Sequence, residues 1–385
     1  MILKHLSSRT TRRVGVLVTA VTLVVALAGP ASALPAKPTA QQGPLSRLNL
    51  PVKNPLNKSK GDGKFHVVGN RIIGPGGGDW IARGVNLGGL EWSPNGYDLA
   101  YWNFKRMKDW GVNFVRVALS DVFWLKSMCT YNKNYATKVD QIVQWGKQLK
   151  MLILLDDHHG TAGQTCGTGK WHNIMRLPDI HNLAFVKALA TRYKNEPYVA
   201  IDLYNEPHDI PDSFWRDGGL LDGYRGLGMQ QMVDGVRSTG YTGLVVATGN
   251  GWGNDLRMVI DNPLSNDKNL VYGAHTYPYW CDGKIVLNEP YWCRGKQFPP
   301  QLESQIPQAA AKRAVIMAEF GTYRPIAGEV AAPIRWAEEH RIGWAAWLWC
   351  NGKATSFCLL AEGGGNNPSV IGQPVRDALR RATGK

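Results

Sequence analysis

Acidic residues are missing from the start of the chain. The first 61 residues contain nine lysines and arginines but no aspartate or glutamate, so nine of the fourteen net positive charges lie there. Residues 62–385 carry the other five, which is a mildly basic balance for a segment of that length. Nucleic-acid-binding domains concentrate much more positive charge than this. The sequence therefore predicts no nucleic-acid partner.

The N-terminal apolar run is too short to be a membrane span. It covers residues 14–28, ends at Gly29-Pro30, follows four basic residues and precedes the small-residue site Ala31-Ser32-Ala33. These are the parts of an export signal. We expect residues 1–33 to be a cleaved signal peptide and the protein to be secreted, with no membrane partner after cleavage. A membrane anchor is the alternative, and the choice between Sec and twin-arginine export stays open.

Residues 34–61 have little apolar periodicity, five prolines and no acid. This composition is typical of a linker. Residues 62–385 are then the globular part. Their number is compatible with two domains, but α/β barrels often reach this length as one domain. We therefore expect a signal peptide, a Pro-rich basic linker and a single barrel.

Cysteine is sparse, and no Cys-x-x-Cys or Cys/His zinc spacing occurs. Six cysteines in an exported chain indicate disulfides rather than a metal site. Sequential pairing is our hypothesis, so that each bridge closes a loop that follows a strand. The three pairs would be Cys129 with Cys166, Cys281 with Cys293, and Cys350 with Cys358.

Strand-like and helix-like segments alternate after Gly76-Gly77-Gly78. One helical pattern, residues 136–150, places Val139, Ile142, Val143 and Gly146 on a single stripe. Eight segments read as strands: Trp80–Asn86, Asn113–Ala118, Met151–Asp156, Val199–Tyr204, Gly243–Thr248, Leu270–His275, Ala314–Glu319 and Gly343–Trp349. Helical patterns between them cover Leu99–Trp110, Asn182–Tyr193, Tyr224–Thr239, Gln301–Lys312, Gly328–Glu339 and Pro374–Ala382.

Eight β/α units predict an α/β fold, a (β/α)8 TIM barrel. Phe65–Val68 and Arg71–Ile73, separated by Gly69-Asn70, predict a small N-terminal β-hairpin that plugs the barrel. The competing fold is an open doubly wound sheet. No Gly-x-Gly-x-x-Gly follows the first strand, so a dinucleotide site has no support and we expect no cofactor.

Polar residues collect at the predicted C-terminal ends of the strands, where barrel enzymes place their chemistry. The tripeptide Asn-Glu-Pro occurs three times, at 195–197, 205–207 and 288–290, but only the second copy follows an apolar strand. The other strand-end residues are Arg116, Asp156, Asp157, His158, His159, His275, Tyr277, Glu319, Trp347 and Trp349.

Two carboxylates, Glu206 and Glu319, therefore end strands four and seven of the predicted barrel. Glycoside hydrolysis needs one acid to protonate the leaving oxygen and a second to attack or stabilise the anomeric carbon. Arg116 beside Glu319 would keep that carboxylate ionised, and Tyr277 would donate a hydrogen bond to it. Glu206 lacks such a cation and is the better general acid. The alternative is that both glutamates have structural roles.

A metal site at residues 156–159 is the other chemistry to consider. Neighbouring residues on a regular strand point to opposite faces. His158 and His159 therefore cannot both face the pocket, and we assign the inward position to His158. We expect no catalytic metal.

Fifteen tryptophans are an unusually large number. Those in loops on the catalytic side can stack on sugar rings. They are Trp92, Trp171, Trp215, Trp252, Trp280 and Trp292. We expect about half of them to form subsites, with Trp252 and Trp280 first because each closely follows a strand end.

One short motif per strand makes the chain resemble glycoside hydrolase family 5, a family of retaining β-glycanases on (β/α)8 barrels. The motifs are Ile81–Asn86, Phe114–Val117, Asp156–His158, Asn205–His208, His275–Tyr277, Ala318–Gly321 and Ala346–Trp347. The resemblance implies Glu206 as acid/base and Glu319 as nucleophile. It implies a cis peptide after Trp347 and a stacking role for that ring. Around the same sugar it places Arg116, His158, Asn205, His275 and Tyr277.

The resulting expectation is a secreted, monomeric endo-β-glycanase that acts by double displacement on a polysaccharide, with β-1,4-glucan as the first substrate. We choose β-1,4-glucan because it is a common substrate in this family and because the predicted cleft is rich in aromatic residues. No residue in the sequence indicates specificity for glucose. Mannan is the main alternative, and other β-glycans stay open. The alternative from a different class is a non-catalytic carbohydrate-binding barrel. Two catalytic-type glutamates argue against it, because a binding module does not need them.

Overall fold

The structure is a computed structural model, and it describes residues 61–384 except 98, 160–174, 222, 266–267, 278–279, 282–283, 286–304, 353–354 and 364. The expected signal peptide and nearly all of the expected linker lie outside these residues. In the described part, no helix combines the length and the apolar character needed to cross a membrane.

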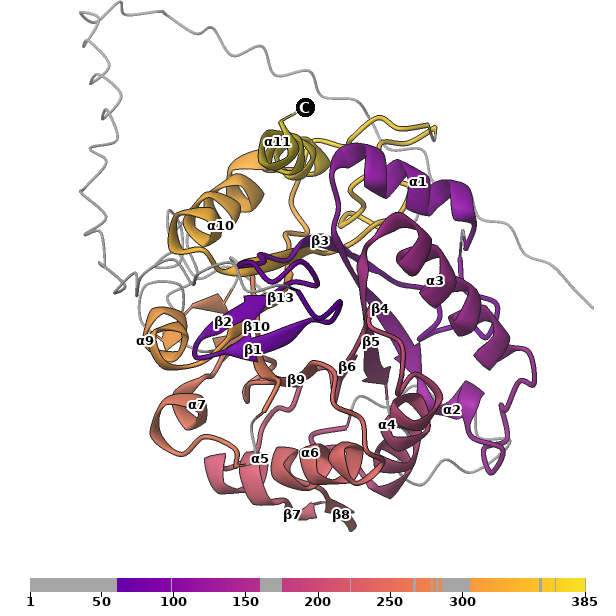
Figure 1. Cartoon of the computed structure of the whole chain (residues 1–385), viewed down its shortest axis with the longest axis vertical. Helices are drawn as coiled ribbons and strands as arrows, with labels where there is room; N and C mark the ends of the chain where they lie inside the picture. The colour runs from indigo at the N-terminus through magenta and orange to yellow at the C-terminus, as the bar shows by residue number, and fades with distance from the viewer. Residues whose placement is uncertain are drawn as a thin grey trace, which may run out of the picture. The chain divides into compact units, whose positions relative to one another are not determined.

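Eight parallel strands form a closed barrel, as the sequence predicts (Figure 1). Adjacent barrel strands follow one another in the chain, and β14 closes the ring by pairing with β3. The barrel strands are β3 (Arg83–Leu87), β4 (Phe114–Ser120), β5 (Leu152–His159), β6 (Val199–Asp202), β9 (Val245–Thr248), β10 (Leu270–Thr276), β13 (Val315–Phe320) and β14 (Gly343–Ala346). Every one lies at a predicted strand position.

Helices surround the barrel (Figure 1). They are α1 (Tyr101–Trp110), α2 (Asp121–Trp124), α3 (Tyr135–Leu149), α4 (Ile180–Arg192), α5 (Asp212–Asp217), α6 (Met229–Ser238), α7 (Arg257–Asp261), α9 (Gln305–Lys312), α10 (Ala327–His340) and α11 (Gly372–Thr383). The longer ones confirm the predicted helical patterns. Helices α2, α5 and α7 were not predicted, because four to six residues are too few to show a helical period.

The predicted helix Tyr224–Thr239 is wrong in its first part. Residues Tyr224–Gly226 form β8, which pairs antiparallel with β7 (Gly219–Leu221), and α6 begins only at Met229. Gly228 is extended and precedes the helix, and Gln231 accepts a hydrogen bond from its backbone N–H. Glycine favours helix starts and disfavours helix interiors, so these glycines displace the helix toward the C-terminus.

The N-terminal hairpin of β1 (His66–Val68) and β2 (Arg71–Ile73) lies across one end of the barrel (Figure 1). Its Phe65 packs edge-on against Trp80 with ring centroids 4.8 Å apart, and Trp80 packs against Phe114 at the start of β4. A buried apolar cluster joins these rings to the first residues of several strands. The predicted plug is therefore confirmed, and it closes the end opposite the strand C-termini.

Short antiparallel pairs complete the described structure. One is β11 (Trp280–Cys281) with β12 (Lys284–Ile285), in the long connection after β10. After β14, a disulfide joins Cys350 to Cys358, as the sequential pairing predicts. Cys129 is also disulfide-bonded, and its expected partner Cys166 lies outside the described residues. The expected pair of Cys281 with Cys293 cannot be placed, since residue 293 is not described.

Candidate active site

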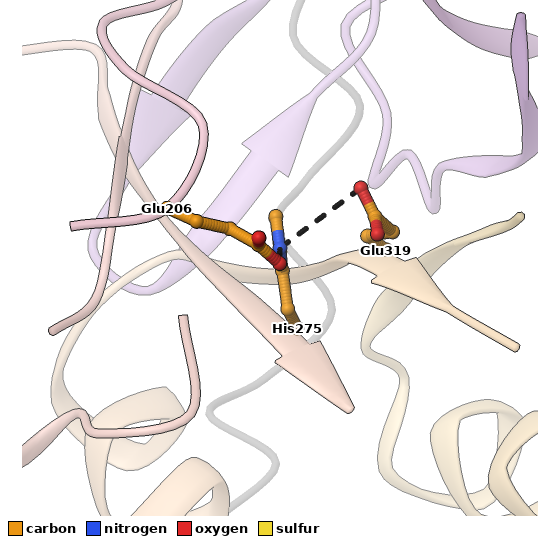
Figure 2. A group of neighbouring side chains, drawn as sticks. All are labelled: Glu206, His275 and Glu319. Atoms are coloured by element: carbon orange, nitrogen blue, oxygen red, sulfur yellow. Dashed lines mark hydrogen bonds and ion pairs between the residues drawn. The ribbon is translucent and has the colours of Figure 1, made fainter. Parts of the chain in front are cut away.

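Barrel closure brings the two predicted carboxylates together. Glu319 lies in β13, and Glu206 lies four residues beyond the end of β6. Between them is His275 of β10, whose Nδ1 is 2.8 Å from Oε1 of Glu206 and 4.0 Å from Oε2 of Glu319 (Figure 2). One oxygen of each glutamate and this nitrogen all lie within 4.8 Å of one another. The two carboxyl groups therefore face a single small space.

Arg116 of β4 is the centre of the charge network beneath this space. Its side chain is fully buried, and its guanidinium lies 3.0 Å from Oε2 of Glu319. The same nitrogen, Nη1, donates to Asn86 at 3.1 Å. The other two nitrogens contact Asp156 at 3.0 Å, Asp202 at 2.9 Å and Asn205 at 2.7 Å. The expected pair of Arg116 with Glu319 is confirmed, but one cation serves three carboxylates.

This sharing changes the electrostatics expected for Glu319. Burial raises its pKa, and the charge of Glu206 adds to that rise. His275, Arg116 and a hydrogen bond from the Tyr277 hydroxyl to Oε1 act in the opposite direction. Arg116 and Tyr277 both act to lower the pKa of Glu319, as expected, but burial acts more strongly and the net shift is upward.

Glu206 has the more strongly shifted carboxyl. Burial raises its pKa to about 8, with Asp156 adding to the rise and the charge of Arg116 opposing it. Its side chain is 18% exposed, whereas that of Glu319 is 7% exposed. At neutral pH Glu206 therefore holds a proton and remains open to the pocket, as a general acid requires.

The two inward histidines are neutral at neutral pH. Burial lowers the pKa of His158 well below its usual value and also lowers that of His275. His158 Nδ1 lies 2.6 Å from Oδ2 of Asp156, and its ring stacks on Trp347 with centroids 5.2 Å apart and planes 7° apart. The Trp347–Leu348 peptide is cis, as expected. His158 therefore orients the indole on the inner side of the site.

Asp157 points away from the pocket, so among the described side chains of residues 156–158 it does not join Asp156 and His158 there. Its Oδ2 accepts a hydrogen bond from Asn182 of α4, while Asp156 faces Arg116. The side chain of His159 is not described. Within the described part of the chain, Glu206, His275 and Glu319 are the one group of His, Cys, Asp or Glu whose ligand atoms lie close enough to hold a metal ion.

Two buried acids near the site were missed by the sequence analysis. Asp202 ends β6 beside Arg116, and burial raises its pKa to about 7. Glu91 lies in the loop after β3, is 1% exposed and accepts a hydrogen bond from the backbone N–H of Gly89. Burial raises the Glu91 pKa to about 8, and the charges of Asp156 and Glu319 add to the rise. The strand-end pattern gave a signal for Asp202, whereas nothing in the sequence marks Glu91 as buried.

The expected aromatic subsites are only partly placed. Trp252 is half-buried and stacks on His208 with centroids 3.6 Å apart. Trp92 is 43% exposed. Trp215 is wholly buried and donates from Nε1 to the carbonyl of Thr248, so it is a core residue and not a subsite. The side chain of Trp280 is not described, and Trp171 and Trp292 lie outside the described residues.

The first Asn-Glu-Pro copy lies where strand context predicts. Its Glu196 precedes β6, at the end of the barrel opposite Glu206, and pairs with Lys147 at 2.9 Å. The third copy, at residues 288–290, lies outside the described part. The two described copies share the same tripeptide but differ in position. Glu206 follows β6 and lies in the site, whereas Glu196 precedes β6 and forms an ion pair with Lys147.

Sequence comparison finds relatives that are named as glycan-degrading enzymes. An endoglucanase of Paenibacillus polymyxa is 27% identical over 247 residues, covering 56% of this chain and 60% of that protein. A mannan endo-1,4-beta-mannosidase of Cellvibrio japonicus is 24% identical over 305 residues, covering 77% of this chain and 61% of its own length. The chain thus spans about three fifths of these two relatives.

Solved structures share the fold. The native beta-glucanase of Saccharophagus degradans superposes with a TM-score of 0.63 at 19% identity, covering 84% of this chain and 94% of that chain. Residues 79–353 match the model of the family described as cellulase (glycosyl hydrolase family 5). The chain therefore belongs to glycosyl hydrolase family 5.

Proposed function

We propose that the protein is a retaining endo-β-glycanase that hydrolyses internal glycosidic bonds by double displacement. The observation that carries this proposal is the approach of Glu206 and Glu319, with one oxygen of each within 4.8 Å. Retaining glycosidases hold their two carboxyl groups ~5–5.5 Å apart, whereas inverting ones leave ~6.5–9.5 Å for a water molecule. This close approach of two carboxyl oxygens supports retention rather than inversion.

In the first step, Glu319 attacks the anomeric carbon while Glu206 donates its proton to the departing glycosidic oxygen. The glycosidic bond breaks, and an ester forms between the sugar and Glu319. The raised pKa of Glu206 supplies the proton at neutral pH. Tyr277 and Arg116 hold the two oxygens of Glu319 and so fix its line of attack.

In the second step, water attacks the anomeric carbon of the ester, and Glu206 accepts its proton. Glu319 leaves as a carboxylate, and two inversions give net retention. His275 contacts Glu206 through Nδ1, which orients the acid toward the leaving oxygen. Asn205 is bound to Arg116 and is placed to meet the sugar, and Trp347 offers its ring as the stacking surface for that sugar.

The proposed substrate is a β-1,4-glucan. Its support is the set of relatives, which includes an endoglucanase of Paenibacillus polymyxa and an endoglucanase C of Evansella cellulosilytica. A β-mannan is the second candidate, supported by the relative from Cellvibrio japonicus and by a beta-mannanase/endoglucanase of Caldicellulosiruptor saccharolyticus. Action outside the cell is part of the proposal and rests on residues 1–33 and on the disulfide of Cys350 with Cys358.

A reducing-sugar assay on cellulose, mixed-linkage glucan, xyloglucan, β-1,3-glucan and mannan tests the substrate. Proton NMR of the first product formed tests the stereochemistry. The proposal predicts the β-anomer first and highest activity on a β-1,4-glucan. First formation of the α-anomer would refute retention, and activity confined to mannan would replace the glucan assignment. Full binding without hydrolysis of any polysaccharide would favour the carbohydrate-binding alternative.

A further inference from the structure

The loop after β14 reaches the nucleophile through an aromatic contact that the proposed mechanism does not use. Phe357 lies in this loop, and its ring packs edge-on against the ring of Tyr277, with centroids 6.2 Å apart and planes 81° apart. Tyr277 in turn donates a hydrogen bond from its hydroxyl to Oε1 of Glu319. Phe357 therefore contacts the side chain that holds the nucleophile.

The hydrogen bonds of the barrel strands do not fix the ring of Tyr277. Strand β10 ends at Thr276, so Tyr277 is the first residue beyond it. The ring lies close to Gly321, where a Cβ would come within 3.3 Å of Cε1 of the tyrosine. Phe357 supplies a further contact, and Tyr277 is only 5% exposed. The direction of the Tyr277 hydroxyl therefore depends on the groups that pack against its ring.

Hydrogen bonds hold Phe357 in place. Its carbonyl accepts from the N–H of Leu348 at 3.0 Å, and its own N–H donates to the hydroxyl of Thr355 at 3.0 Å. The N–H of Leu359 donates to the carbonyl of Leu348 at 3.0 Å. The segment that carries Phe357 therefore lies beside the residue that follows Trp347.

A disulfide closes the same loop. It joins Cys350 to Cys358, the residue after Phe357, across a sequence separation of eight. Cys358 is buried, and the N–H of Leu360 donates to the carbonyl of Cys350 at 3.1 Å. A bridge between residues so close in sequence restricts the conformations of the loop between them. It therefore helps to keep Phe357 against Tyr277.

Displacement of Tyr277 would act directly on Glu319. The hydrogen bond from Tyr277 favours the ionised carboxylate, so its loss would raise the pKa of Glu319 further above the ordinary value. Arg116 would then hold the nucleophile at Oε2 alone. A misplacement of ~1 Å in a reacting group can cost ~10²-fold in rate. A contact one side chain away from the nucleophile can therefore change the rate.

We propose that Phe357 is a positioning residue for the nucleophile, because it holds Tyr277 against Glu319 and is itself held by the bridge between Cys350 and Cys358. The role of Glu319 in this inference rests on the proposed function. A merely structural role is the alternative, in which Phe357 stabilises the loop after β14 without acting on Tyr277. The two roles differ in the effect that a substitution of Phe357 has once the Tyr277 hydroxyl is absent.

A double-mutant cycle on the full chain tests the proposal. Phe357→Ala should lower kcat on the best polysaccharide ~10-fold with a smaller change in KM, since the lost contact acts on the transition state. In the Tyr277→Phe background the same substitution should lower kcat less than ~2-fold, because the hydroxyl that Phe357 positions is already gone. The acidic decline of kcat/KM should move to higher pH in Phe357→Ala. Phe357→Leu, which keeps a large apolar side chain, should recover most of kcat.

The matched control is Phe214→Ala, which removes another half-buried phenylalanine, in α5 against Gly219. It should leave kcat and the acidic decline unchanged. Cys350→Ser/Cys358→Ser tests the bridge, and it should lower kcat and shift the acidic decline in the same direction as Phe357→Ala. Melting temperatures of all variants establish that kcat is measured on folded protein. If Phe357→Ala does not fold, the cycle is run with Phe357→Val.

An equal loss of kcat from Phe357→Ala in both backgrounds would overturn the proposal, because Phe357 would then act without Tyr277. An unchanged kcat in Phe357→Ala would also overturn it. Full kcat in Cys350→Ser/Cys358→Ser would overturn the role of the bridge. Failure of the proposed function has a different signature, since the unchanged protein would then hydrolyse no polysaccharide and the inference would fall with it.

Discussion

The guanidinium of Arg116 lies 3.0 Å from Oε2 of Glu319, and the same side chain contacts two further carboxylates, Asp156 and Asp202. One buried cation therefore faces three buried acids. Burial raises the pKa of Asp156 to about 6 and that of Asp202 to about 7, although Arg116 opposes both shifts. These acids therefore take up protons at a higher pH than free carboxylates do, and this governs how the site responds to mutation and to pH.

Replacing either glutamate with its amide should remove most activity. Glu206→Gln and Glu319→Gln should each lower kcat on polysaccharide by ~10²–10⁴-fold or more, because one removes the proton donor and the other the nucleophile. Initial rates and single-turnover kinetics on the best polysaccharide measure this effect.

A substrate with a good leaving group distinguishes the proton donor Glu206 from the nucleophile Glu319. A nitrophenyl leaving group needs little protonation, so Glu206→Gln should form the glycosyl-enzyme from an aryl glycoside at a much less reduced rate than Glu319→Gln. The matched control is Glu196→Gln, in the other described Asn-Glu-Pro sequence, where Glu196 pairs with Lys147 far from the site. Full activity of either active-site variant would contradict the assignment.

Activity should fall on the alkaline side as Glu206 loses its proton. Its pKa in the free protein is about 8, and only the protonated form can assist departure, so kcat/KM should decline as pH rises through this value. On the acidic side kcat/KM should decline as Glu319 gains a proton, at a pH above the usual glutamate range because burial raises its pKa.

The pH dependence of Glu206→Gln checks that assignment. With an aryl glycoside whose departure needs no acid, this variant should lose the alkaline decline while keeping the acidic one. Glu91→Gln is the control, since Glu91 also has a pKa of about 8 but lies outside the proposed proton transfer. An alkaline decline that disappears in Glu91→Gln and persists in Glu206→Gln would reverse the interpretation.

Glu91 should make the folded state more stable at low pH than at high pH. Its pKa is about 8 in the folded protein and 4.5 in the ordinary reference state, so the folded state binds the proton more tightly. This stabilisation is complete below the unfolded pKa and is lost as pH rises through the folded value. Denaturant unfolding from pH 4 to pH 9 should therefore show a shallower decline for Glu91→Gln than for the unchanged protein.

Other buried acids also make the free energy of unfolding depend on pH. Asp121 has a pKa raised by burial to about 8, and Asp202 one raised to about 7, so both also favour the folded state at low pH. Glu91→Gln should remove only part of the slope. An identical slope in Glu91→Gln would show that Glu91 is not buried in solution.

The sequence was sufficient to predict the barrel and its central pair because both follow from strand periodicity. When eight strands are parallel and closed, residues at their C-terminal ends must meet, so Arg116, Glu206 and Glu319 were brought together by topology alone. Topology does not determine the contacts of side chains beyond the strand ends, because these depend on packing. Asp157 turns out toward Asn182 of α4, and Trp215 enters the core to reach Thr248.

Loop positions were the hardest to predict, for the same reason. Glu91 lies in a connection without periodicity, and the hydrogen bond from Gly89 that folds it inward is a local turn that composition does not reveal. The sharing of Arg116 by Asp156 and Asp202 was missed because strand alternation gives the face of each residue but not which acids compete for one cation.

Removing the buried cation should destabilise the protein strongly. Arg116→Met leaves Asp156, Asp202 and Glu319 without their shared positive charge, and breaking a buried ion pair by removing one partner costs about 3–5 kcal/mol. Part of this cost will be recovered as the acids take up protons, so the loss of stability should shrink as pH falls from 8 to 5. Urea unfolding at several pH values measures both effects.

The matched control for Arg116→Met is Arg83→Met. Arg83 pairs with Glu338 at 2.7 Å, but the two side chains are 22% and 29% exposed, and ion pairs of this kind contribute only ~0–1 kcal/mol. Its loss should be small and nearly independent of pH over the same range. If Arg116→Met were no more destabilising than Arg83→Met, the three acids must be largely protonated in the unchanged protein. Glu319 could then serve as a nucleophile only after losing a proton, and the proposed first step, which includes no base, would need one to accept that proton.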